Sequence, residues 1–361
     1  MINLNSFPSS MVNISDISCN ISELLRSNPI IGGINNQTNK DLTHSLQEYL
    51  NKQVVLTNSG TNSLLIAIEY ALKVAHHKKI RWIISEYIYF SIASFLMNRT
   101  ESIVILTATE DEVTLTDNNE INDYDFFNIV ILTSHNNKNC TIPKCVYELK
   151  EKFIIEDRCL VFGLPSNHTV DVECYSFSNN KLLVAGEGGC IVSQDSEFIS
   201  WARLRTFNGI IPTRNIPYFM YLGMYQIQDN VSPFKASTTS LSSLLLLEQL
   251  RVLPRIIEKR VENYHYLNSK FNFSSEVPDC PLFYSLKLPE HYNFKKIQDF
   301  QTKCIRDGVQ TMMGVLPYMS FLNKNNTIYK KKKVLSIPVH TELHTEDLDH
   351  IAITILKHYE N

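Results

Sequence analysis

The chain has 361 residues, 44% of them hydrophobic and 20% charged, which is ordinary for a soluble globular protein and enough for a large and a small domain. A formal net charge of −3 gives no sign of the basic surface that nucleic-acid binding needs. The sequence has no apolar run of roughly 18 residues and no signal-peptide pattern at its start, so we expect a cytoplasmic protein without a membrane span.

The first half of the chain predicts two helical segments, followed by a regular alternation of strands and helices. The helical segments lie around Ile21–Arg26 and Lys40–Leu50. The predicted strands are Val54–Thr57, Arg81–Ile84, Ser102–Leu106, Asn128–Thr133, Phe153–Ile155, Cys174–Phe177 and Cys190–Ser193. Between the first two strands, residues 62–74 carry apolar side chains at the spacing of a one-faced helix. This alternation predicts an α/β fold with a mostly parallel sheet flanked by helices.

The second half predicts a smaller α+β unit. A long helical run, Leu241–Leu267, leads into it. Short strands around Leu282–Leu288 and Val334–Ile337 follow, and the helix Thr345–His358 closes the chain. We therefore predict a large domain over residues 1–245 and a small C-terminal domain over residues 246–361, with an N-terminal segment that can pack on the small one.

Ser59-Gly60-Thr61 lies at a strand end, where ligands of parallel sheets collect, and directly before a predicted helix. A helix N-terminus presents unpaired N–H groups and a positive dipole end, which suits a phosphate. Gly60 lets the backbone approach an anion closely, and the Thr61 hydroxyl can add a hydrogen bond. The alternative is a simple helix cap in which Ser59 or Thr61 satisfies a free amide.

Two charged groups fall at later strand ends. Glu156-Asp157 ends one strand, where a carboxylate can pair with a protonated ring nitrogen, although acidic turns are common after strands. Lys181 follows Ser176 in a tight loop, and the turn Gly186-Glu187-Gly188-Gly189 returns the chain into the next strand. A lysine held inside a pocket loses hydration, which frees its amine to form an imine; most single lysines are instead surface residues.

An aromatic cluster, Tyr87-Ile88-Tyr89-Phe90, follows the strand Arg81–Ile84. A planar ring at this place can stack on a heterocycle, although core packing is the commoner use of such residues. An anion site, a carboxylate, a reactive amine and a stacking ring together match the groups of pyridoxal 5'-phosphate.

The order of these pieces resembles the DegT/DnrJ-type aminotransferases, a family of fold-type-I enzymes that use pyridoxal phosphate and mostly aminate keto sugars attached to nucleotides. The most specific part is the spacing from Ser176-Phe177 to Lys181 and on to Gly186–Gly189. The resemblance covers nearly the whole chain; the other matching residues are Leu24-Leu25-Arg26-Ser27, Gly32-Gly33, Ser59-Gly60-Thr61, Glu156-Asp157, Gly163, Leu204-Arg205, Gln249-Leu250, Leu335–His340 and Thr345-Glu346-Asp347.

This resemblance implies a role for each candidate residue. Lys181 is expected to hold the cofactor as a Schiff base and, once released, to act as the base that moves the substrate proton. Asp157 is expected to pair with the pyridinium. The expected phosphate ligands are Gly60, Thr61 and Ser176, and Tyr89 is expected to stack on the ring. The family also implies a homodimer with shared active sites.

Two positions depart from the family pattern. Leu160 stands where the family usually has Gln or His near the phenolic oxygen of the cofactor, so a hydrogen-bond partner is missing there. The segment Pro233–Ser237 replaces a Gly-aromatic-Asn-aromatic-Arg motif whose Asn reaches the phosphate of the partner subunit. Lys235 can replace that Asn with a charged phosphate donor, or it is an ordinary surface charge.

We therefore expect an aminotransferase that takes an amino group from an amino acid, with L-glutamate as the first choice. It would store the group as pyridoxamine 5'-phosphate and deliver it to a keto substrate, with a nucleotide-linked keto sugar favoured. A non-sugar carbonyl in a specialised biosynthetic pathway remains an alternative. Lys181 argues against the dehydratase branch, in which histidine replaces the lysine. Leu160 and the altered Lys235 segment would instead support a non-catalytic relative.

The remaining polar clusters give weaker signals. His340 and His344 are four residues apart, but Pro338 argues against the helix that would make them metal ligands. We keep His340 as a candidate substrate contact at the rim of the site. Cys140 and Cys145 lack a second pair to complete a zinc set, so we expect no metal and free thiols. The run Lys330–Lys333 is typical of a solvated loop, although it could attract a nucleotide diphosphate.

Overall fold

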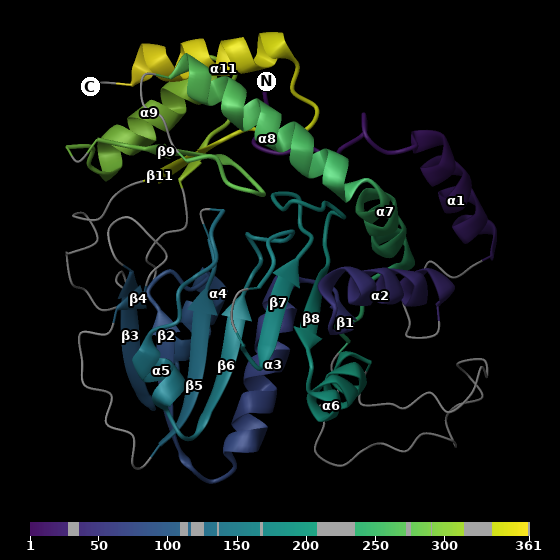
Figure 1. Cartoon of the computed structure of the whole chain (residues 1–361), viewed down its shortest axis with the longest axis vertical. Coiled ribbons are helices and arrows are strands. Elements are labelled where there is room, and N and C mark those ends of the chain that lie inside the picture. Colours follow the sequence, from purple (N-terminus) through teal and green to yellow (C-terminus); the bar gives the residue numbers. More distant parts are fainter. Residues whose placement is uncertain are drawn as a thin grey trace.

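The computed structural model describes residues 1–27, 36–108, 115–116, 126–135, 137–166, 169–207, 235–271, 276–289, 291–313 and 334–359. Three features named in the sequence lie outside these residues: Gly32-Gly33, Pro233-Phe234 and Lys330–Lys333. The described chain forms a large sheet with its helices, and above it a layer of long helices with a small sheet (Figure 1).

The large sheet has eight strands in the order β1-β8-β7-β6-β5-β2-β3-β4. Their bounds are β1 Gln53–Thr57, β2 Lys79–Ser85, β3 Ser102–Ala108, β4 Leu115–Thr116, β5 Phe126–Thr133, β6 Lys152–Asp157, β7 Val172–Ser176 and β8 Gly189–Ser193. The run β7-β6-β5-β2-β3 is parallel, whereas β8 lies antiparallel between β7 and β1, and β4 pairs antiparallel with β3. The predicted, mostly parallel sheet is confirmed.

Helices cover both faces of this sheet because its central strands are apolar on both sides. The helices around this sheet are α2 Gln37–Leu50, α3 Gly60–Ala75, α4 Phe90–Met97, α5 Lys144–Glu148 and α6 Ser196–Thr206. Helix α1, Ile14–Ser27, packs instead on the helix Ser240–Arg251. Neighbouring residues of β2 show the alternation: Ile84 packs in the core with α3, α4 and α6, whereas Ile83 packs in the core with α5.

The upper layer contains α7 Ser240–Arg251, α8 Leu253–Lys270, α9 Phe294–Arg306 and α11 Thr345–His358, around the small sheet β10-β11-β9. The strands of this sheet are β9 Tyr284–Lys287, β10 Met312–Met313 and β11 Val334–Ile337. The long helical run predicted over Leu241–Leu267 consists of two helices, α7 and α8, separated at Val252. Pro254 lies in the first turn of α8, where its missing N–H is tolerated, and its ring prevents a continuous helix.

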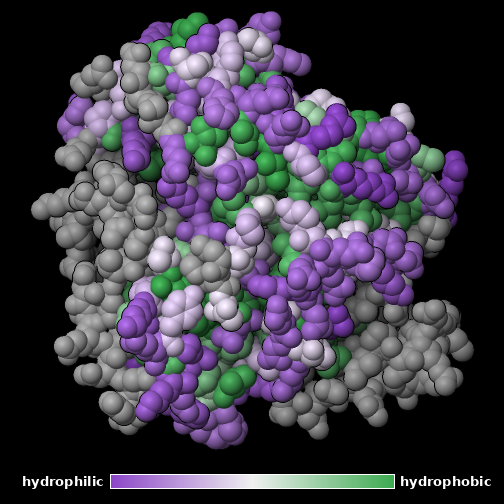
Figure 2. All heavy atoms as spheres, viewed as in Figure 1, coloured by the Kyte–Doolittle hydropathy of each residue, from purple (hydrophilic) through white to green (hydrophobic). Residues whose placement is uncertain are grey.

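The N-terminal residues join this upper layer. Ile2 forms a bridge with Val309, and its amide donates to the carbonyl of Gly308 at 2.6 Å. Hydrophobic side chains gather near α7 and α8 on the face that Figure 2 shows. None of the helices in the described part of the chain is long and apolar enough to cross a membrane.

Candidate active site

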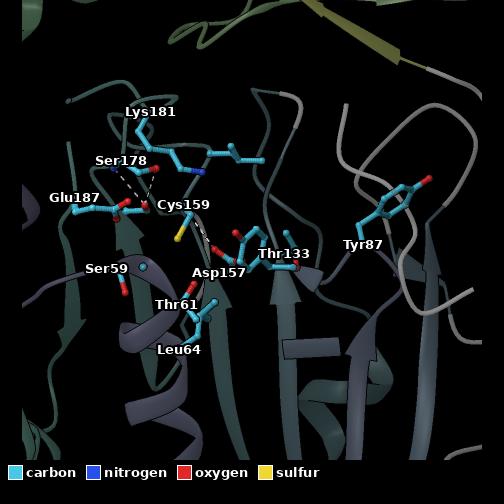
Figure 3. A pocket seen from close by; sticks show the side chains of 14 residues that line it. Ser59, Thr61, Leu64, Tyr87, Thr133, Asp157, Cys159, Ser178, Lys181 and Glu187 are labelled. Carbon is cyan, nitrogen blue, oxygen red and sulfur yellow. Dashed lines mark hydrogen bonds between the residues drawn. The ribbon is translucent and has the colours of Figure 1, made fainter. Parts of the chain in front are cut away.

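A pocket of about 260 Å³ lies at the carboxyl ends of the central strands (Figure 3). Thr133, Asp157 and Ser176, the last residues of β5, β6 and β7, all face it. Among the described residues, the lining consists of Ser59, Gly60, Thr61, Leu64, Tyr87, Tyr89, Thr133, Asp157, Cys159, Leu160, Ser176, Ser178, Lys181 and Glu187. The fold therefore brings together Gly60, Thr61, Tyr89, Asp157, Ser176 and Lys181, as the sequence predicts.

The floor of the pocket is the N-terminus of α3. The Ser59 hydroxyl caps this helix by accepting the Asn62 amide at 3.2 Å. A Cβ atom on Gly60 would lie 2.6 Å from Ser176 Cβ and 2.8 Å from Cys159 Sγ, so only glycine allows the first turn to approach the strand ends this closely. The capping role and the anion-site role are thus compatible: Ser59 caps the helix, while Gly60 and Thr61 line the pocket.

The loop that carries Lys181 folds back on the end of β7. The Phe177 amide donates to the carbonyl of Gly188 at 2.9 Å, and the Ala185 amide donates to the carbonyl of Phe177 at 2.9 Å. Gly186 has φ +77°, which favours glycine in this turn. Figure 3 shows Lys181 reaching into the pocket from above, with Asp157 and Thr61 below it.

Asp157 is a buried carboxylate with a raised pKa. Its side chain is 4% exposed, and its Oδ1 accepts the Cys159 amide at 3.0 Å. Burial raises the pKa of Asp157, while the Cys159 amide and the charge of Lys181 act in the opposite direction. A cationic ring nitrogen in the pocket would relieve this burial cost by pairing with the carboxylate.

Glu156, the neighbour of Asp157, faces the other side of the sheet. It forms a fully buried ion pair with Arg158 at 2.9 Å and accepts the Ser134 hydroxyl. Arg158 also donates to the Tyr175 hydroxyl at 2.9 Å, and that hydroxyl donates to Glu173 at 3.0 Å. Of the predicted pair Glu156-Asp157, only Asp157 therefore lines the pocket.

The pocket contains polar groups without a hydrogen-bond or ion-pair partner in the described part of the chain, and these groups and the free space beside them fit pyridoxal phosphate. The Thr133 hydroxyl is buried and has no hydrogen-bond partner among the residues that the structure describes. The space above Gly60 is open because that residue has no side chain, and it adjoins the free amides of a helix N-terminus. Asp157 could provide the anion for a pyridinium, and Lys181 could provide the amine for an aldehyde.

Besides Asp157, Lys181 and Glu187, the pocket is lined by side chains that carry no charge at neutral pH. Burial raises the pKa of Tyr87 to about 12, and the charge of Glu86 adds to the effect, so its phenol remains protonated at neutral pH. Burial and the nearby Asp157 raise the pKa of Cys159 well above its usual value. Leu160 lines the pocket as an apolar residue.

Sequence comparison assigns the chain to a family. A sequence model of the DegT/DnrJ/EryC1/StrS aminotransferase family matches residues 153–356, more than half of the chain. The chain belongs to this family. Membership implies a small-molecule substrate and an amino donor. Among curated proteins, a sequence search found no match.

Solved structures show the same fold at low sequence identity. The sugar aminotransferase CalS13 from Micromonospora echinospora has a TM-score of 0.74 and 16% identity over 99% of this chain and 100% of its own. PseC from Helicobacter pylori, an aminotransferase of pseudoaminic acid biosynthesis, has a TM-score of 0.75 and 16% identity over 95% of this chain and 96% of its own. A candidate sugar aminotransferase from Streptococcus pneumoniae, in its pyridoxamine phosphate form, has a TM-score of 0.74 and 16% identity over 95% of this chain and 94% of its own.

Two residues that the family resemblance singled out lie outside the pocket lining. Lys235 is exposed and forms an isolated bridge with Phe207; the next residue, Ala236, accepts the Asn58 amide at 2.6 Å. His340 is 4% exposed, and its Nε2 lies 3.2 Å from the carbonyl of Asn3. Burial and the charge of Arg260 lower the pKa of His340 to about 4.

His344 is the N-cap residue of α11, directly before its first turn. Among the described residues, no group of three or more His, Cys, Asp or Glu side chains is arranged to hold a metal ion.

Several residues that line the pocket are not predicted by the sequence analysis. Thr133, Cys159 and Ser178 were not predicted to contribute, although each lies within three residues of a predicted strand end or site residue. The strongest sequence signal is that of Thr133, because it ends the predicted strand Asn128–Thr133. The carboxyl ends of parallel strands meet at one edge of the sheet, which places Thr133 beside the other strand-end residues. The register of β5 and β6 places it opposite Asp157.

Proposed function

We propose that this aminotransferase binds pyridoxal phosphate through Lys181 and transfers an amino group from an amino acid to a nucleotide-linked keto sugar. The observation that carries the proposal is the meeting of Lys181, Asp157 and the N-terminus of α3 in one pocket. An amine, a buried carboxylate and an anion site in this arrangement match three of the polar groups of the cofactor.

Each residue then has a defined task. Gly60, Thr61 and Ser176 would hold the phosphate, Asp157 the ring nitrogen, and Tyr89 the face of the ring. The bound cofactor supplies an electron sink for the substrate carbon that loses its proton. Lys181 Nζ would form the covalent link to the cofactor and, once released, accept the proton from the substrate carbon and return it on the cofactor side.

The sugar substrate is supported by the relatives. CalS13 and the Streptococcus pneumoniae protein are described as sugar aminotransferases, and PseC is described as an aminotransferase involved in the biosynthesis of pseudoaminic acid. The Streptococcus pneumoniae protein has been solved in apo, pyridoxal phosphate and pyridoxamine phosphate forms, which supports the same cofactor cycle here. We take L-glutamate as the first amino donor to test.

We also propose a homodimer in which Lys235 reaches the phosphate of the partner subunit. Lys235 is exposed and lies outside the lining of its own pocket, which leaves its ammonium available to a neighbouring chain. The cytoplasm remains the proposed location, since all eight cysteines are free thiols, as reducing conditions favour.

Spectroscopy of the purified protein tests the function. With pyridoxal phosphate we expect an absorbance band that is absent in Lys181→Ala and present in the control Lys295→Ala, which changes an exposed lysine of α9. Excess L-glutamate should convert this band to that of pyridoxamine phosphate and release 2-oxoglutarate. A nucleotide-linked keto sugar should then restore the first band. A Lys181-dependent band that no amino acid converts would overturn the transaminase proposal, and the absence of any such band would favour a non-catalytic relative.

A further inference from the structure

The N-terminal segment reaches from the small sheet to the loop of Lys181. The side-chain amide of Asn5 donates to the carbonyl of Asn179 at 3.0 Å and to the carbonyl of Lys181 at 2.7 Å. Both N–H groups of one amide are therefore used on the backbone around the proposed catalytic lysine. The two contacts join residues 174 and 176 positions apart in the chain.

Arg260 of α8 determines which way the Asn5 amide points. Its Nη2 donates to Asn5 Oδ1 at 2.6 Å, and its Nη1 donates to the carbonyl of Leu282 at 2.8 Å. A guanidinium can only donate, so the oxygen of Asn5 must face Arg260 and the nitrogen must face the lysine loop. Burial lowers the pKa of Arg260 to about 10, so this donor remains charged at neutral pH.

Four further contacts hold the segment before Asn5. Ile2 pairs with Val309, and its carbonyl accepts the Gln310 amide at 2.9 Å. The Gln310 side chain accepts the Leu4 amide at 3.0 Å. The buried ring of His340 lies against the carbonyl of Asn3 at 3.2 Å. Residues 2–5 are thus fixed to the upper layer along their whole length.

We propose that Asn5 is a positioning residue for Lys181: with Arg260 behind it, it fixes the backbone from which the catalytic amine reaches the cofactor. This inference rests on the proposed function of Lys181. The lysine side chain has four rotatable bonds, so the place of its backbone determines where Nζ can reach. A misplacement of about 1 Å in a reacting group can cost up to a hundredfold in rate.

The test uses Asn5→Asp, which keeps the size of the side chain and its contact with Arg260 but removes both donors. Gln310→Ala is the matched control, because it removes an anchor of the same segment that does not touch the lysine loop. Apo protein is mixed with pyridoxal phosphate, and the rate at which the Lys181-dependent band appears is recorded. We expect Asn5→Asp to slow this rate about tenfold and Gln310→Ala to change it less than about twofold. Asn5→Gln, with the donors one carbon further out, should recover part of the rate.

A second readout needs no cofactor. Hydrogen exchange of the Lys181 and Ala185 amides, which bond within the loop, should speed up in Asn5→Asp and stay unchanged in Gln310→Ala. Band formation at the wild-type rate in Asn5→Asp, together with unchanged exchange, would overturn the inference and leave the function of Lys181 standing. A wild-type protein that forms no Lys181-dependent band would instead overturn the proposed function, and exchange alone would then show whether Asn5 orders the loop.

Discussion

The end of β6 presents two chemically opposite regions on the two faces of one sheet. On one face, Asp157 and Thr133 line a pocket; Asp157 accepts a backbone amide, and the Thr133 hydroxyl has no partner among the described residues. On the other face, Glu156 and Arg158 form a buried pair that continues through Tyr175. The comparison shows that a buried carboxylate with an ion-pair partner in the fold, such as Glu156, serves the fold. Asp157 has no such ion pair among the described residues, so it fits a cationic ligand that would pair with it.

The face of the sheet that carries the Glu156–Arg158 ion pair should contribute more to the stability of the fold than the pocket face does. Arg158→Met would leave the Glu156 carboxylate buried without its cation, which typically costs about 3–5 kcal/mol. Urea unfolding of the apo protein measures this loss. The double change Glu156→Gln with Arg158→Met should recover a large part of it, because no unpaired charge remains. The Lys181-dependent band should persist in the folded double variant; loss of the band there would show that the two faces are not separable.

The pocket face should dominate activity. Asp157→Asn removes the anion that pairs with the pyridinium, and we expect turnover to fall on the order of 10² to 10³-fold, the usual cost of losing one preorganised electrostatic group in an active site. Single-turnover amine transfer from the amino donor measures this effect. Turnover within a few fold of wild type would exclude Asp157 as the pyridinium partner.

Asp157→Asn, which should lower activity, should raise the stability of the apo protein. The pKa of Asp157 is raised in the folded protein, so the folded state holds this proton to higher pH than the unfolded state does. The apo protein therefore loses stability as pH rises above the unfolded pKa of about 3.9, and the loss is complete above the folded pKa. Apo Asp157→Asn should be more stable than wild type at neutral pH and indistinguishable from it near pH 3. Equal pH profiles for the two proteins would contradict this.

Gly60→Ala should weaken cofactor binding. The added Cβ would lie 2.6 Å from Ser176 Cβ, so the first turn of α3 must move away from the strand ends. Overpacking of this kind typically costs about 1–3 kcal/mol. Equilibrium titration with pyridoxal phosphate should show an affinity lower by roughly tenfold or more. Gly308→Ala, at a turn outside the pocket, serves as the control for a general loss of stability.

Thr133→Val should have the smallest effect on cofactor affinity, and Thr133→Ser is its matched control. Loss of one hydrogen bond to a bound group should weaken the cofactor by about 1 kcal/mol, roughly fivefold, whereas Thr133→Ser should bind as wild type does. The apo form of Thr133→Val should be as stable as wild type or more stable, because a buried hydroxyl without a partner is replaced by a methyl group. Unchanged cofactor affinity would remove Thr133 from the binding site.

Much of the fold and the centre of the site were predictable from the sequence because their signals are local. Strand periodicity and the turn after Lys181 locate the residues at strand ends, and parallel strands bring such ends together. The break at Val252 is not evident from the apolar pattern, which continues through it; the local signal for the break is Pro254, which lies in the first turn of α8.

The other parts depend on contacts that no local pattern contains. The role of Thr133 follows from its register with Asp157, and that of Asn5 follows from contacts with residues far along the chain. The burial of His340 depends on Asn3, which lies 337 positions away in the chain, so no residue near His340 in sequence indicates it.

The most direct test of the central claim, that Lys181 is the residue joined to the cofactor, is reductive trapping. The protein is incubated with pyridoxal phosphate, reduced with borohydride and digested, and the modified peptide is identified by mass spectrometry. We predict one modified site, Lys181, with labelling abolished in Lys181→Ala and retained in Lys295→Ala. Stoichiometric label on another lysine, or none on Lys181 at saturating cofactor, would contradict the account of this pocket.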